Sequence, residues 1–238
     1  MSCPDTVSVV SVSESNPSAV PRELRCGVAA GPVFVGGFAV IGAGRTGYDW
    51  RRHAVSSLAA GRGGWPQRGN FVLVGALYCI AADGLARTMI RTGLPRVVPA
   101  VVFGVGAGLI GSGVFVTDPV AGFPPDEHHA DEACSPRAEP TLHGKLHNLC
   151  AIPIFVGTPV AAMSCAVVGA HKADYRWALY SAGSAVAMSG AFVLFARAFG
   201  TAGHAGMGGF WQRVSIATGF GWLSALSLRA LISSRAAS

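Results

Sequence analysis

Charged side chains are scarce in this chain of 238 residues, since only 13% of its residues are Asp, Glu, Lys or Arg. Soluble domains carry about 25% charged residues, so this composition excludes a soluble catalytic domain. The formal net charge is +6, but the basic residues form no stripe interleaved with aromatic side chains. Such a stripe is typical of a nucleic-acid-binding surface, and we therefore expect no nucleic-acid partner.

The short motifs of several common protein classes are also absent. The six cysteines form no CxxC pair, which argues against both a disulfide framework and a zinc knuckle. The chain contains no GxxxxGK[ST] phosphate loop, no GxSxG nucleophile elbow and no HExxH zinc motif. The standard patterns of nucleotide binding, serine hydrolysis and zinc proteolysis are therefore excluded.

Long apolar segments dominate the sequence instead, and 51% of all residues are hydrophobic. The six segments cover residues 26–44, 70–90, 97–117, 143–169, 177–197 and 208–231. Each is close to the roughly 20 residues that cross a bilayer as a helix, and none shows the alternation of a membrane β-strand. We predict an all-α fold, a polytopic integral membrane bundle of six transmembrane helices over residues 25–232.

The two ends of the chain are polar. We predict a disordered N-terminal tail over residues 1–24, a first apolar segment that is a retained anchor, and a short C-terminal tail over residues 233–238. Six spans place both termini on one side of the membrane. Basic residues divide evenly between the two sides, whereas acidic residues gather on the side opposite the termini. We predict a multi-pass protein of the cell membrane with cytoplasmic termini.

Two histidines four residues apart mark the start of the fourth apolar segment. His143 and His147 lie on one face of a helix, a spacing that suits metal ligation, proton transfer, hydrogen bonding to a substrate or a purely structural role. His53 and Asp118 are expected on the same side of the membrane. We predict that Asp118, His143, His147 and His53 form a catalytic polar site at one membrane border. Asp118, His143 and His147 are the candidate ligands of a divalent metal such as zinc.

Four further residues are candidates for substrate binding. Arg51, Arg52 and Ser56 lie in a long polar loop between the first two apolar segments, and Arg213 lies at the start of the last segment. Guanidinium groups bind phosphate or carboxylate well, but they also lie among lipid headgroups at membrane borders. Arg213, if buried, needs a partner such as Asp118 or a substrate anion; the alternative is snorkelling to the interface.

Four short motifs occur in order along the chain: residues 53–58 (HAVSSL), 113–119 (GVFVTDP), 122–124 (GFP) and 142–147 (LHGKLH). This series resembles the domain-of-unknown-function 998 family of prokaryotic integral membrane proteins, over roughly residues 26–231. The resemblance implies a compact six-helix membrane protein. It implies no reaction, because the family as a whole has none assigned.

The polar residues are also similar in kind to those of membrane hydrolases such as alkaline ceramidases and adiponectin-receptor-like proteins. Those proteins hold zinc with a Ser and His on one helix, an Asp on another and a paired His near the C-terminus. Here His53 with Ser56 or Ser57, Asp118 and the His pair offer similar groups. The His pair lies in the fourth span, the Ser–His order is reversed and the span count differs, so the similarity is one of chemistry.

Two functions therefore stay open. The first is a membrane enzyme, a hydrolase or an isoprenoid isomerase or cyclase, that acts on a lipid-like or isoprenoid substrate by acid–base or metal-assisted chemistry. The second is a small transporter, a lipid-binding subunit or an assembly subunit. In either case the expected partners are membrane lipids or a hydrophobic small molecule. A single cavity holding His53, Asp118, His143 and His147 would favour the enzyme.

Overall fold

The computed structural model describes residues 22–125, 139–200 and 206–236, and within them the chain is helical apart from loops and one isolated bridge. Six helical segments are long and apolar enough to cross a membrane, which confirms the prediction of an all-α, multi-pass integral membrane protein. Five spans are single helices, α1 (Leu24–Ala43), α2 (Trp65–Thr92), α3 (Val97–Val114), α7 (Tyr175–Gly200) and α8 (Gly208–Ala236). The fourth span combines α5 (Leu142–Ile152), η3 (Pro153–Gly157) and α6 (Thr158–His171).

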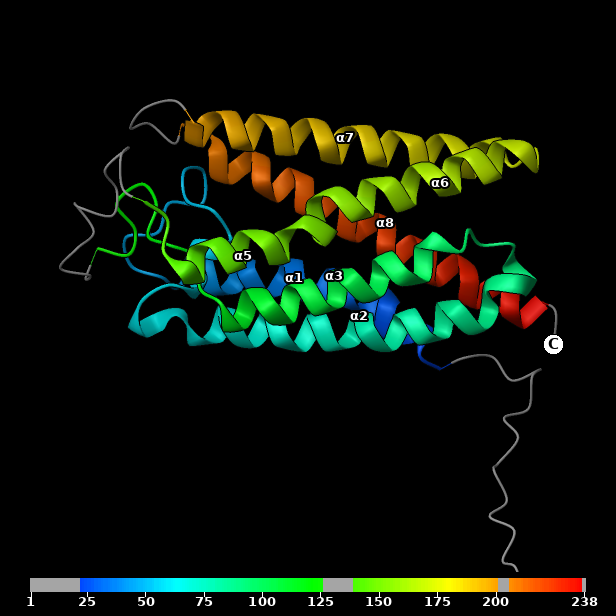
Figure 1. Cartoon of the computed structure of the whole chain (residues 1–238), viewed down its shortest axis with the longest axis horizontal. Helices are drawn as coiled ribbons and strands as arrows, with labels where there is room; N and C mark the ends of the chain where they lie inside the picture. Colours follow the sequence, from blue (N-terminus) through cyan, green and yellow to red (C-terminus); the bar gives the residue numbers. More distant parts are fainter. Residues whose placement is uncertain (1–21, 126–138, 201–205, 237–238) are drawn as a thin grey trace, which may run out of the picture.

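The helices run along the long axis of an elongated bundle (Figure 1). Helix α1 begins and α8 ends at the right of this view, which we call the terminal end. The opposite, loop end carries the first loop (residues 44–64, with the short helices η1, Ser56–Ala59, and η2, Arg62–Gly64), the segment after α3 and the start of α8. The predicted N-terminal tail lies outside the described residues up to position 21, and α8 continues into the range expected to be a C-terminal tail.

The surface of the bundle is apolar along the spans, as expected for a protein solvated by lipid. Ile90 is 90% exposed and Leu179 is 74% exposed, and many other large hydrophobic side chains face outward. Large aromatic side chains fill much of the core, among them Trp222, Phe34 and Phe220. A soluble monomer rarely exposes contiguous apolar surface on this scale, so lipid chains rather than water cover these faces.

Glycine allows the helices to approach closely in this core. Helix α2 packs along α3, and α1 packs between α2 and α8. A methyl group added at Gly106 of α3 would lie 2.6 Å from the carbonyl oxygen of Gly75 in α2, and one added at Gly31 of α1 would lie 2.7 Å from that of Phe220 in α8. Any side chain at these positions would force the backbones apart, which is why small residues recur at membrane helix interfaces.

The fourth span is interrupted between α5 and α6. Pro153 begins a π-helical segment, η3, and Pro159 follows in the first turn of α6. Proline lacks the N–H that an α-helix needs and clashes with the preceding turn, so the ladder widens locally. Such π-helical segments often lie at functional sites, and Ile154 of η3 turns its side chain into the bundle.

Candidate functional site

Arg213 of α8 fixes the first loop to the bundle. Its Nη1 donates to the carbonyl oxygens of Trp50 (2.7 Å), His53 (3.1 Å) and Gly209 (2.9 Å), and its Nη2 contacts the hydroxyl of Tyr48. The guanidinium also lies 5.4 Å from the centre of the Tyr48 ring. Backbone carbonyls and an aromatic face therefore take the place of the anionic partner that the sequence suggested.

The first loop in turn completes the N-terminus of α8. The N–H groups of Gly209 and Phe210 donate to the carbonyl oxygens of Arg52 (3.2 Å) and Arg51 (3.0 Å). The N–H groups in the first turn of a helix have no acceptors inside the helix, and here the loop carbonyl oxygens are those acceptors. The side chains of Arg51 and Arg52 are exposed, with the Arg51 guanidinium 5.2 Å from the centre of the Trp50 ring. Their predicted binding of an anionic substrate group stays a prediction.

His53 is buried inside this loop with both ring nitrogens engaged. Its Nδ1 accepts the N–H of Asp49 at 2.9 Å, and its Nε2 lies 3.3 Å from the carbonyl oxygen of Ala121. A carbonyl only accepts, so the neutral ring carries its proton on Nε2. The ring also stacks on Phe123, with the ring centres 5.2 Å apart. Neither nitrogen is left for a metal or a substrate, and the predicted catalytic role of His53 gives way to a structural one.

The burial of His53 predicts a pH dependence of stability. Burial lowers the pKa of His53, while its bond to the Ala121 carbonyl and the nearby Asp49 carboxylate raise it in part, and Arg52 and Arg213 lower it further. The unfolded chain, with a histidine pKa near 6.5, therefore takes up the proton first as pH falls. The stability from neutral His53 is present above about pH 6.5 and is lost at lower pH.

We expect the apparent Tm in mild detergent to fall more between pH 7.5 and pH 5.5 for the wild type than for His53→Asn. The asparagine oxygen takes the position of Nδ1, accepts the Asp49 N–H and does not titrate. The same pH dependence in both proteins would contradict this role of His53.

Asp118 lies at the N-terminus of α5 and supports its cap. Thr141, the N-cap residue, donates its N–H (3.1 Å) and its hydroxyl (2.5 Å) to the Asp118 carboxylate, and the same hydroxyl accepts the N–H of Gly144 at 3.1 Å. A carboxylate at this end of a helix also interacts favourably with the helix dipole. The suggested pairing of Asp118 with Arg213 is therefore wrong, because each has other partners.

Asp118 and His143 do share one space, a recess of about 360 Å³ at the loop end that we call the border recess. Arg68 of α2 also lines it and donates its Nε–H to the carbonyl oxygen of Ala59 at 2.8 Å. His143 is exposed, with its ring edge-on to Phe115 at 5.8 Å between centres. A carboxylate, an imidazole and a guanidinium thus meet where the bundle reaches the membrane border.

His147, one turn further along α5, points into the bundle. Its side chain is buried, and its Nδ1 lies 2.8 Å from the carbonyl oxygen of Phe115, to which it donates. The neutral ring therefore has its lone pair on Nε2. The backbone of Ser112 also interacts with this ring. His147 is thus an imidazole oriented by the C-terminal end of α3.

The space that His147 lines is the interior pocket, formed by side chains of α1, the first loop, α2, α3, α5, η3 and α8. Most of its lining is apolar, and its polar members are Ser56, Ser112, His147 and Gln212. Its volume is about 30 Å³, close to the share of one water molecule in the liquid. Gln212 closes it toward the loop end, since its Oε1 accepts the N–H of Val55 at 2.6 Å.

Gln212, Ser112 and Arg68 are site residues that the sequence-based prediction did not include. Gln212 and Arg68 carry a signal in hindsight, because each is a polar side chain at the start of an otherwise apolar helix. Ser112 carries none, since serine is common in membrane helices as a small packing residue.

The predicted metal ligands do not converge. His143 lines the border recess, whereas His147, one turn further along α5, lines the interior pocket. Within residues 22–125, 139–200 and 206–236, no three His, Cys, Asp or Glu side chains are arranged to hold a metal ion. Residues 126–138, which include two more histidines, lie outside the described part. Asp118, His143 and His147 therefore form no shared three-ligand site.

Comparisons with known proteins agree with the fold and name no reaction. No curated protein and no solved structure matches this chain. One family, DUF998, described as a protein of unknown function, matches residues 28–229, from the second turn of α1 to the last part of α8. Because this match covers most of the sequence and all six spans, the chain belongs to the DUF998 family of membrane proteins of unknown function.

Proposed function

We propose that this protein is a membrane enzyme that acts on a lipid-like or isoprenoid molecule by acid–base chemistry at His147. The observation that carries the proposal is the buried imidazole of His147, which lines a pocket of mostly apolar side chains. Ionisable groups within membrane spans mark functional sites. A hydroxyl or an acidic C–H group of a substrate would lie against the basic nitrogen of this ring.

The bond from Nδ1 to the Phe115 carbonyl prepares His147 for this role. It fixes the ring orientation and the tautomer, and it makes Nε2 the basic atom. In an isomerisation, Nε2 would take a proton from one substrate carbon and return it to another, with no net change in protons. The hydroxyls of Ser56 and Ser112 line the same pocket and are placed to hydrogen-bond a substrate oxygen.

The border recess supports the substrate's entry from the membrane. Its Arg68 and His143 offer cationic and hydrogen-bonding groups at the level where lipid headgroups lie. Arg213 adds a second cation beside a groove of about 290 Å³ that is lined by Phe38 of α1, Tyr48 and Trp50. An apolar chain with an anionic or hydroxyl end matches this combination of an apolar bundle surface and polar groups at its border.

A non-enzymatic role as a lipid-binding, transport or assembly subunit is the second candidate. The small volume of the interior pocket favours it, because about 30 Å³ leaves room for one water molecule rather than a whole substrate group. Among the described residues that line this pocket, His147 is also the only titratable side chain. In this case His147 would hold a bound water or a lipid hydroxyl without turnover.

Reconstitution separates the two candidates. Purified protein would be incubated in vesicles made from a total lipid extract that includes isoprenoids, and the lipids followed by mass spectrometry. The enzyme predicts a species that changes in mass or chromatographic position with the wild type and persists unchanged with His147→Asn. Co-purifying lipid without any converted species, across all lipid classes, would contradict the enzyme and support the binding role. A metal-assisted reaction would instead be supported if the wild type contained stoichiometric zinc and the His143→Ala/His147→Ala protein contained none.

We infer further that the protein resides in the cell membrane with cytoplasmic termini. In the sequence, the acidic residues concentrate in the loops on the side opposite the termini, and the short turns on the side of the termini carry Arg96 and Lys172. Short loops rich in basic residues face the cytoplasm in most membrane proteins. We expect a reporter enzyme that works only in the cytoplasm to be active when fused to the C-terminus. Activity of an exported reporter at the same position would reverse the orientation.

A further inference from the structure

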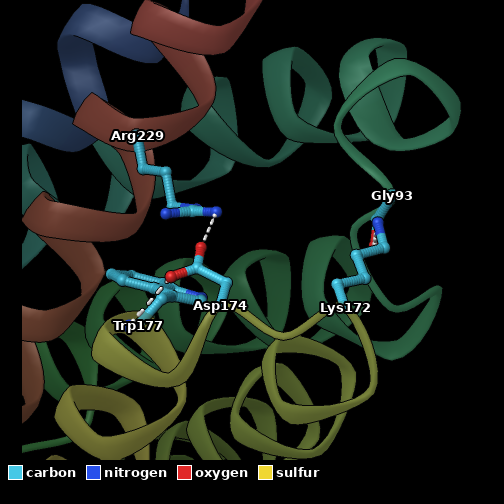
Figure 2. Close-up of polar contacts among 5 residues, drawn as sticks. All are labelled: Gly93, Lys172, Asp174, Trp177 and Arg229. Atoms are coloured by element: carbon cyan, nitrogen blue, oxygen red, sulfur yellow. Dashed lines mark hydrogen bonds and ion pairs between the residues drawn. The ribbon is translucent and has the colours of Figure 1, made fainter.

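A second polar cavity lies at the terminal end of the bundle, where α6 ends and α7 begins (Figure 1), and Figure 2 shows five of the residues that line it. The turn after α2, the turn between α6 and α7 and the last part of α8 surround a space of about 50 Å³, which we call the terminal recess. Lys172, Asp174 and Arg229 are its charged lining residues, and Val168 and Leu226 are among its apolar ones. Three segments distant in sequence thus build one cationic recess.

Arg229 is oriented by its contacts, but these contacts leave some of its N–H donors available. Its Nη2 lies 2.6 Å from Oδ2 of Asp174, and its guanidinium lies 5.0 Å from the centre of the Trp177 ring. Asp174 also accepts the N–H of Trp177 at 3.3 Å, and this bond, followed by Arg229, lowers the pKa of Asp174. The ionised pair is neutral as a whole. Arg229 has five N–H donors, so it keeps several for another acceptor.

Lys172 adds a positive charge that no carboxylate within the described residues neutralises. Its Nζ lies 3.4 Å from the carbonyl oxygen of Gly93, a long contact that leaves most of the ammonium free. Figure 2 shows Arg229 above Asp174 and Lys172 to the right of it, with the Lys172 side chain turned toward Gly93. Gly93 ends α2 in a left-handed conformation, and a methyl group there would lie 1.8 Å from Nζ, so the lysine lies directly across this turn.

Aromatic side chains place the recess at the level of lipid headgroups. The Trp177 ring is partly exposed, and the ring of Tyr180, which is exposed, lies 5.7 Å from it between centres. Trp and Tyr concentrate where membranes meet water. The apolar lining of the recess includes Leu94 and Val168, which are partly exposed, and Leu226, which is buried. A ligand with an anionic head and an apolar tail would place its head at the charged residues and the start of its tail against Leu94 and Val168.

We propose that the terminal recess binds the phosphate group of an anionic membrane lipid between Lys172 and Arg229. The ammonium and the guanidinium supply charge-assisted hydrogen bonds to phosphate oxygens. The apolar walls select a lipid over free phosphate, which has no tail to place against them. This site does not depend on His147 or on any reaction at the loop end.

The test is a titration of purified protein in mild detergent with phosphatidylglycerol, followed by native mass spectrometry. We expect Lys172→Gln to lower the affinity for this lipid about fivefold, since each basic residue near a membrane surface contributes attraction of that order. Lys172→Arg is expected to keep the affinity. Arg25→Gln is the matched control, because Arg25 is an exposed cation at the same end of the bundle but outside the recess.

Three results would overturn the proposal. The first is an equal loss with Arg25→Gln, which would assign the binding to diffuse positive charge at this border. The second is unchanged affinity in Lys172→Gln. The third is binding of inorganic phosphate as strong as that of phosphatidylglycerol, which would make free phosphate the ligand. Phosphatidylcholine has a headgroup without net charge. We expect it to bind more weakly than phosphatidylglycerol to the wild type, and we expect this difference to disappear in Lys172→Gln.

Discussion

Replacing Arg213 by methionine is expected to lower the free energy of unfolding by about 3 kcal/mol. The change keeps an apolar stem but removes the donors to the carbonyl oxygens of Trp50, His53 and Gly209. Those oxygens lie where α8 meets the first loop, and the bonds to His53 and Gly209 are part-buried. In a chain of this size we expect the apparent Tm in mild detergent to fall by about 6–12 °C.

Arg51→Met is the matched control for this change. Arg51 lies in the same loop and is exposed. Within the described residues its guanidinium lies over the ring of Trp50. We expect its substitution to change stability by less than about 0.5 kcal/mol. Limited trypsin digestion adds a local measurement, because release of the loop should speed cleavage at Arg51 and Arg52 in Arg213→Met. Equal shifts in the two variants would contradict the role of Arg213 as the residue that fixes the loop.

Replacing His147 by asparagine is expected to lower turnover at least about 100-fold, the usual contribution of a positioned acid–base group. Asparagine places an amide N–H near the position of Nδ1, so the bond to the Phe115 carbonyl can persist. The basic nitrogen that faces the interior pocket is lost. The measurement is the rate of lipid conversion in reconstituted vesicles, together with the apparent Tm as a check that the fold is kept.

Asp118→Asn and His143→Asn test whether the border recess takes part in the same chemistry. Asp118 supports the N-cap of α5 through Thr141, so its substitution is expected to lower stability by about 1 kcal/mol and to leave turnover largely intact. His143 is exposed and is expected to affect entry of the substrate more than its conversion. If His147→Asn kept full turnover while Asp118→Asn abolished it in a folded protein, the reacting group would lie in the border recess instead.

The six spans could be predicted from the sequence because crossing a membrane sets a simple condition on length and apolarity. The predicted ends of the spans were less accurate. Helix α2 begins at Trp65 rather than at residue 70, because its first turn holds polar residues that face the loop end. The π-helical break at Pro153 was not predicted either, since proline is ordinary in membrane helices and its neighbours decide how the ladder adjusts.

The helix that carries the paired histidines could be predicted from the sequence, but the surroundings of each ring could not. His143 and His147 lie one turn apart on α5, yet His143 lines the border recess and His147 lines the interior pocket. His53 was grouped with them because it lies at the same end. Its nitrogens are instead taken by Asp49 and Ala121, partners that only the folded loop brings close.

The sequence by itself determined that this protein is a six-span membrane bundle and that its ionisable residues collect at the two membrane borders. Both follow from the cost of placing polar groups in a bilayer, which acts on every residue regardless of its neighbours. Tertiary structure alone decided which polar groups were satisfied. The carbonyls around Arg213 and the cap around Asp118 engage these side chains, and the end of α3 orients His147 through the carbonyl of Phe115. These hydrogen bonds join segments that are distant in the sequence. The helical period predicts which face of a helix a side chain lies on, but it does not predict which residues of other segments lie against that face.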